Sequence, residues 1–153
     1  MTRAISDLSA DVLRHRFLEY QERQQAAIRA EDIPAANRHA MKVKRYADAL
    51  AATPRGRDML EELAGSPLPF VRHRAAQWVV DWAPELAVPV LGRHLIEDFG
   101  PDLSVDERLE LRISAKHSLY AFFGIRSFDH NDLIEPLKAY GIDLSYRDHS
   151  AWQ

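Results

Sequence analysis

Seven histidines are the side chains in this sequence most suited to metal binding or acid–base catalysis. A zinc or facial-triad site would need two or three of them at short helical spacing, and no His-Glu-x-x-His or similar pattern occurs. We therefore expect no metal site and interpret the histidines as ordinary surface or half-buried residues. They are His15, His39, His73, His94, His117, His130 and His149.

Acidic residues offer no better catalytic pattern. Pairs such as Glu61 with Glu62 are adjacent, so on a helix their side chains point about 100° apart and do not converge. The oxygen-rich segment 129–132 lacks the glycine and the distant glutamate of a calcium loop, and we expect it to start a helix. We find no glycine-rich phosphate loop, nucleophile elbow or dinucleotide fingerprint, and no cysteine. The sequence predicts a protein that is not an enzyme and needs no cofactor.

Basic residues gather at two places, which keeps nucleic-acid binding open as an alternative. One group is Arg38, Lys42, Lys44 and Arg45, and the other is the run 72–74. The formal net charge of −3 disfavours a nucleic-acid partner, because useful affinity needs a clearly basic face. The simpler interpretation is surface charge, with Arg72 and Arg112 hydrogen-bonding between repeats.

The elements that position these residues all have helical periodicity. Ser9 is a plausible N-cap for a helix over 10–30, and Pro34 suits the first turn of a second helix. Apolar residues follow at steps of three and four in both, and in the second helix Ile33 belongs to this stripe. Since the turn between them is short, residues 9–52 are predicted to form an antiparallel hairpin.

Residues 53–124 are predicted to form two further helix pairs of the HEAT type. Thr53, Ser104 with Glu107, and Gly124 supply capping signals. The segment from Val71 to Trp82 matches the segment from Leu111 to Phe122 at an offset of 40 residues, a period typical of HEAT repeats. Residues 125–153 are expected to hold a short helix, 133–140, and a C-terminal tail. We thus predict one all-α, HEAT-like domain over 1–153.

Composition agrees with such a domain. The chain is 46% hydrophobic and 28% charged, and no stretch has the length of a membrane span. The first residues lack the apolar run of a signal peptide, so we expect a cytoplasmic protein without a membrane partner. The sequence does not predict an oligomeric state.

Three segments resemble a family of small bacterial helical proteins with a HEAT-like fold and no established function. They are the long first helix, Asp32-Ile-Pro-Ala-Ala-Asn-Arg, and Ser66-Pro-Leu-Pro-Phe-Val-Arg-His-Arg-Ala-Ala followed by Trp82-Ala-Pro-Glu-Leu-Ala. The resemblance covers roughly residues 8–95 and implies no catalytic residues. It also implies a role seen in related small bacterial proteins, that of an immunity partner of a secreted toxin.

We therefore predict a protein–protein interaction module, with neutralisation of a cognate bacterial toxin as the sharper hypothesis. The alternatives are a nucleic-acid-binding or repair-like HEAT protein and a structural scaffold subunit. Four aromatic residues are predicted to belong to the core: Trp78, Trp82, Phe122 and Phe123. Periodicity predicts these outward positions as partner contacts: His73, Arg74, Gln77, Asp81, Ser114, His117 and Ala121.

Overall fold

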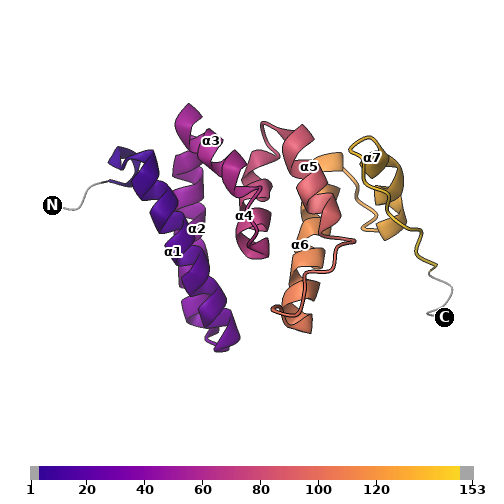
Figure 1. Cartoon of the computed structure of the whole chain (residues 1–153), viewed down its shortest axis with the longest axis horizontal. Helices are drawn as coiled ribbons and strands as arrows, with labels where there is room; N and C mark the ends of the chain where they lie inside the picture. Colours follow the sequence, from indigo (N-terminus) through magenta and orange to yellow (C-terminus); the bar gives the residue numbers. More distant parts are fainter. Residues whose placement is uncertain (1–3, 149–153) are drawn as a thin grey trace. The chain divides into compact units, whose positions relative to one another are not determined.

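A computed structural model describes residues 4–148 of the chain, and these residues form an all-helical protein without strands (Figure 1). The predicted all-α class is confirmed. The elements, in chain order, are η1 (Ile5–Asp7), α1 (Ala10–Arg29), α2 (Ile33–Ala51), α3 (Pro54–Leu63), α4 (Pro69–Val79), α5 (Pro84–Arg93), α6 (Val105–Phe123), η2 (His130–Leu133) and α7 (Ile134–Lys138).

The chain divides after Trp78 into two compact units. The first unit is built on the predicted hairpin, in which α1 and α2 lie side by side (Figure 1). Ser9 and Asp32 cap these helices by accepting hydrogen bonds from the backbone N–H groups of Val12 and Ala35. The buried side chains between them include Leu13, Phe17, Val43, Ala47 and Leu50. Ile33, which we predicted to face inward, is 58% exposed because it occupies the first position of its helix.

Helix α3 packs its first turn tightly against the end of α2. Thr53 caps α3 by accepting a hydrogen bond from the backbone N–H of Gly56 at 3.1 Å. A Cβ atom at position 56 would lie 2.0 Å from the carbonyl oxygen of Leu50, so only glycine permits this approach. Met59, Leu60 and Leu63 are buried.

Helix α4 completes the first unit and is joined to α1 by polar groups. The Arg74 guanidinium donates to the side-chain oxygens of Gln21 at 3.3 Å and of Gln24 at 3.2 Å. Both glutamines are buried, and the Gln21 amide nitrogen has no hydrogen-bond partner. The helix ends at Val79, so Trp82, the last residue of the matched segment, lies beyond it.

The second unit contains α5, α6 and α7. Pro89 lies inside α5, which nevertheless runs for 10 residues. Gly92 allows close contact with the segment after α7, since a Cβ there would lie 2.9 Å from Ile142 Cγ1. Ile142 and Leu144 are buried, so the described part of the predicted tail closes this core. Residues 149–153 lie outside the described residues.

The helices of the predicted repeat show matching burial. Val71, Ala75 and Val79 are buried, as are their counterparts Leu111, Ala115 and Leu119. Arg72 and Arg112 each donate to a backbone carbonyl that precedes their own helix, those of Ser66 and Glu97, both at 3.2 Å. These two bonds are equivalent in the two helices, and hydrogen bonding of the arginines between repeats stays a prediction. The HEAT-like stacking and the single-domain organisation stay predictions.

Among residues 4–148, none of the helices combines the length and the hydrophobicity that a membrane crossing requires.

Candidate functional site

Helix α6 has its two ends fixed by local interactions. Ser104 Oγ accepts a hydrogen bond from the backbone N–H of Glu107, and Glu107 Oε1 accepts one from the backbone N–H of Ser104, each at 3.1 Å. This is the predicted capping box. At the other end Gly124 has φ = 69°, the left-handed conformation that commonly ends a helix. The capping interactions thus define where this 19-residue helix begins and ends, and so where its side chains lie.

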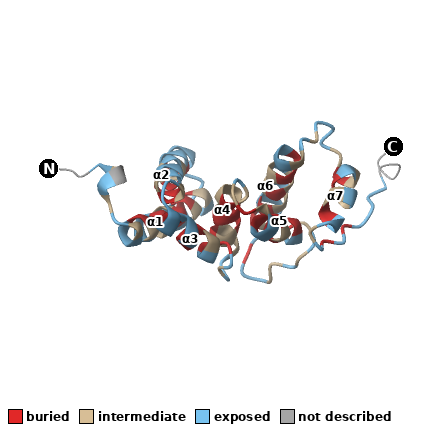
Figure 2. Cartoon of the chain, turned by 90° about the horizontal axis from the view of Figure 1, so that it is seen from above, coloured by how far each residue is buried: buried red, intermediate tan, exposed pale blue. Residues whose placement is uncertain are grey.

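Apolar residues lie on both sides of α6. Leu111, Ala115 and Leu119 are buried, whereas Val105, Leu109 and Ile113, spaced by four residues, are 75%, 53% and 47% exposed. Figure 2 shows both buried and exposed residues on this helix. The exposed row therefore leaves three apolar side chains in contact with water on one side of α6.

Leu109 and Ile113 of the exposed row line a shallow hollow of about 550 Å³, and its described lining residues all belong to α6. We call its lining residues, together with Val105, the α6 outer surface. They are Val105, Asp106, Leu109, Glu110, Ile113, Ser114 and His117. The surface ends at His117, where the Phe128 ring packs on the His117 ring with centroids 6.0 Å apart. From Val105 to His117 it extends about 18 Å along the helix axis.

The two edges of the α6 outer surface differ in charge. Asp106 and Glu110, one turn apart, are exposed and place carboxylates along one edge. Lys116 lies on the other side of the row, and burial, followed by the nearby charge of Arg147, lowers its pKa. Arg108 and Arg112 lie on the same side of the row as Lys116 and are half-buried, so one edge of this surface is acidic and the other is basic.

Two predicted contact residues on α6 belong to this surface. Ser114 and His117 line the hollow, and Ala121, one turn further along, is exposed. The prediction missed Val105, Leu109 and Ile113 as contact residues. Their signal in the sequence was a second apolar stripe on a helix that already had one facing the core.

The contact positions predicted on α4 do not form an outward surface. His73 is only 5% exposed, and burial followed by the charges of Arg74 and Arg72 lowers its pKa to about 3. Arg74 is bound to the buried side chains of Gln21 and Gln24. The prediction that His73 and Arg74 face outward is therefore wrong, because α4 is buried on most of its circumference. Gln77 is half-buried, and Asp81, beyond the helix, is exposed.

The four aromatic residues predicted as core are not buried. Trp78, Trp82 and Phe123 are half-buried, and Phe122 is exposed. The Trp78 indole N–H donates to Asp48 Oδ1 at 2.9 Å, which holds this ring at the surface of the first unit. Phe122 and Phe123 pack on each other and on Tyr140 near the end of α6. The prediction that these four rings belong to the buried core is therefore wrong, since none of them is fully buried.

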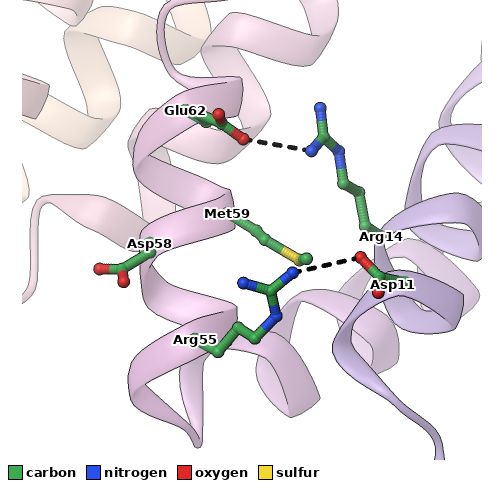
Figure 3. Close-up of a pocket in the computed structure, with 6 residues that line it drawn as sticks. All are labelled: Asp11, Arg14, Arg55, Asp58, Met59 and Glu62. Carbon is green, nitrogen blue, oxygen red and sulfur yellow. Dashed lines mark hydrogen bonds and ion pairs between the residues drawn. The ribbon is translucent and has the colours of Figure 1, made fainter.

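A second hollow, of about 390 Å³, lies between α1 and α3 (Figure 3). Arg14 points to Glu62 and pairs with it at 3.1 Å, and Arg55 reaches Asp11 at 3.5 Å. Asp58 points away from both pairs in this view. The charged side chains are well exposed and mostly neutralise one another, so the hollow has no clear preference for an anion or a cation.

The histidines are more deeply placed than expected. His73, His94 and His130 are buried, and His130 Nε2 lies 3.0 Å from the carbonyl oxygen of Ser145. Burial is also the main reason that the pKa of His130 is lowered. Within residues 4–148, no three His, Asp or Glu side chains converge as metal ligands. His149 lies outside the described residues. The segment 129–132 begins η2, with Asp129 accepting a hydrogen bond from the Asn131 N–H.

Some of the predicted basic residues of α2 form ion pairs, and others are exposed. Lys44 pairs with Asp48 at 3.2 Å, whereas Arg38 and Arg45 are exposed on the same side of the helix. In the basic run 72–74, Arg72 and Arg74 donate hydrogen bonds to groups of the first unit.

No protein-family model, curated protein or solved structure matches this chain.

Proposed function

We propose that this protein is a non-enzymatic protein-binding module whose partner binds the α6 outer surface. The observation that carries the proposal is the exposed row of Val105, Leu109 and Ile113 on a helix that already buries an opposite apolar side. Contact with a partner would remove this apolar area from water, which is the main driving force of most protein associations.

Site-specific cross-linking in the native host tests this proposal. A photoreactive amino acid at position 113 should cross-link to one protein, whereas the same group at Met41, an exposed apolar residue of α2, should not. The cross-linked protein, once identified and purified, should bind the wild type and lose binding to Leu109→Asp/Ile113→Asp. Circular dichroism checks that this variant remains helical. Equal cross-linking at both positions, or unchanged binding of the double variant, would overturn the proposal.

The finer form of this proposal is that the partner is a toxin, which binding neutralises. Its support is the acidic edge of the α6 outer surface together with the net charge of −3. Toxins that act on nucleic acid need basic surfaces, and complementary charge speeds their capture. The cross-linked protein, expressed alone, should stop growth, and wild-type protein but not Ile113→Asp should restore it. A partner that is harmless alone would overturn the toxin role and leave the binding function intact.

Nucleic-acid binding is the second candidate, and the exposed Arg38 and Arg45 on α2 are the observation that favours it. A labelled short DNA or RNA should then bind at low salt, weaken steeply as salt rises, and be lost in Arg38→Glu/Arg45→Glu. Absence of binding at low salt would remove this candidate.

A further inference from the structure

We infer that one side of the α1–α2 hairpin binds the phosphate backbone of a nucleic-acid duplex. We call it the hairpin basic surface, and five basic residues define it. They are Arg16, Arg23, Arg38, Lys42 and Arg45. The inference rests on the second candidate function, nucleic-acid binding, and deepens it by naming the surface, the part of the ligand that is contacted and the form of nucleic acid. It does not depend on the α6 outer surface.

Contacts between the two helices place both arginines of α1 on this side. The Arg16 guanidinium donates a hydrogen bond to the Tyr46 hydroxyl at 3.3 Å, so this side chain reaches across to α2. Arg23 lies over the Tyr20 ring, with its Cζ atom 5.1 Å from the ring centroid. The Tyr20 ring in turn stacks on Tyr46, with centroids 5.7 Å apart. Both arginines are exposed, and they are about 10.5 Å apart along the α1 axis.

The basic residues of α2 form a second row. Lys42 comes four residues before Tyr46, so the two side chains lie on one side of α2. Arg38 and Arg45 are four and three residues from Lys42, and both are exposed. This row is also about 10.5 Å long. Because α1 and α2 lie side by side, the two rows belong to one face of the hairpin (Figure 1).

Helix α4 packs on a different side of α1. Its Arg74 donates to the side-chain oxygen of Gln21. Gln21 is five residues from Arg16 and two from Arg23, so its side chain points about 140° to 160° away from theirs. The hairpin basic surface is therefore not the side of α1 that α4 covers.

The positive charge of this surface is concentrated and largely unneutralised. Within residues 4–148, the one ion pair that its five basic side chains form joins Arg23 to Glu19, at 2.8 Å. The net charge of −3 of the whole chain thus conceals a local excess of positive charge. A duplex carries one negative charge per roughly 1.7 Å of its axis, so a segment about 10.5 Å long presents about six phosphate charges. Five cations in two rows suit such a segment.

The aromatic rings between the two rows favour contact with phosphates over contact with bases or with a protein. Tyr46 is 3% exposed, and the Tyr20 ring contacts Tyr46, His39 and Arg23. Little ring surface is left on which a base could stack, and a single strand depends on such stacking more than a duplex does. Protein interfaces usually have an apolar centre, which these covered rings do not supply.

Fluorescence anisotropy with a labelled duplex and with one of its strands tests the inference. The duplex should bind more tightly than the strand, whatever its base sequence. Its affinity should fall by roughly a hundredfold or more between about 50 and 200 mM salt, as expected for four or five phosphate contacts. The slope of log K against log salt should become shallower by about 1 in Arg16→Gln and by about 2 in Arg38→Gln/Arg45→Gln.

A matched control separates the local surface from net charge. Arg93→Gln/Arg126→Gln makes the same change in net charge as Arg38→Gln/Arg45→Gln, at exposed positions of the second unit, and should leave the salt slope unchanged. Circular dichroism checks that each variant remains helical. Equal slopes for the two double variants would overturn the inference.

Further outcomes distinguish this inference from the candidate function on which it rests. If the single strand binds as tightly as the duplex and Arg38→Gln/Arg45→Gln weakens both, nucleic-acid binding stands and the duplex backbone is wrong. If neither binds at low salt, both ideas fail. Binding to vesicles of phosphatidylserine and phosphatidylcholine, without binding to the duplex, would identify an anionic membrane as the ligand and overturn the inference.

Discussion

Arg74 on α4 donates a hydrogen bond to the buried side chain of Gln24 on α1, at 3.2 Å and across 50 residues of sequence. A second bond reaches Gln21, one turn earlier on the same helix. The fork of a single guanidinium thus fixes where α4 lies on α1.

Arg74→Lys is expected to destabilise the protein by about 1–3 kcal/mol, because an ammonium group cannot reproduce the two-bond fork and leaves a buried amide oxygen without its donor. Urea unfolding measures the loss. Arg38→Lys, at an exposed position of α2, is the control and should change stability by less than about 0.5 kcal/mol. Equal stability of the two variants would show that the Arg74 bonds contribute nothing.

His73 should make the protein less stable in mild acid. The pKa of His73 in the folded protein is about 3. Below pH 6.5 the His73 ring therefore binds a proton in the unfolded chain but stays neutral in the folded protein. Stability therefore falls as pH decreases from 6.5 towards 3, and this contribution amounts to about 1 kcal/mol from roughly pH 6 to pH 5.

The difference between wild type and His73→Gln isolates this contribution, because glutamine does not titrate. The variant should show a shallower loss of unfolding free energy over the same pH range. NMR of the His73 ring gives an independent check. Titration of this ring at its ordinary pKa in the folded protein would contradict the prediction.

Gly56→Ala should be among the most damaging single substitutions in the first unit. The added Cβ would lie 2.0 Å from the Leu50 carbonyl oxygen, so α3 must shift away from α2. We expect a loss of about 3 kcal/mol or more in the free energy of unfolding. Gly65→Ala is the matched control, since the nearest atom to its Cβ is Glu62 O at 3.4 Å. Similar melting temperatures for the two variants would be incompatible with this contact.

Ser104→Ala removes one half of the capping box that starts α6. The backbone N–H of Glu107 then loses its acceptor, and the expected cost is about 1 kcal/mol. Ser145→Ala, at an exposed residue whose backbone oxygen the substitution leaves in place, should have almost no effect. Thermal unfolding of both variants checks the difference, and the idea fails if the two cannot be told apart.

The helix boundaries were the most predictable part of this fold, because capping is a local interaction. Ser9, Thr53 and Ser104 each accept the hydrogen bond expected of an N-cap. Gly124 and Gly141 both have the positive φ expected of residues that end helices. These contacts join residues three or four positions apart, so they can be predicted from short stretches of sequence.

The outward faces were less predictable, since periodicity identifies a face only when one side of a helix is polar. On α4, the buried residues Val71, His73 and Ala76 point in different directions. This helix therefore has no polar, exposed side of the kind that periodicity would identify as a contact surface. On α6, two apolar stripes were available, and nothing in the sequence distinguishes the stripe of Leu111 from that of Leu109. Only packing decides which stripe is buried.

The distance in sequence between Gln24 and Arg74 also has a consequence during synthesis. At typical rates of translation, the ribosome adds Arg74 roughly 2.5 to 10 seconds after Gln24. The hairpin of α1 and α2 depends on neighbouring contacts and can form within that time. Gln21 and Gln24 stay hydrated until α4 leaves the ribosome. For some seconds, the side of α1 that α4 later covers is therefore accessible to a chaperone or a protease.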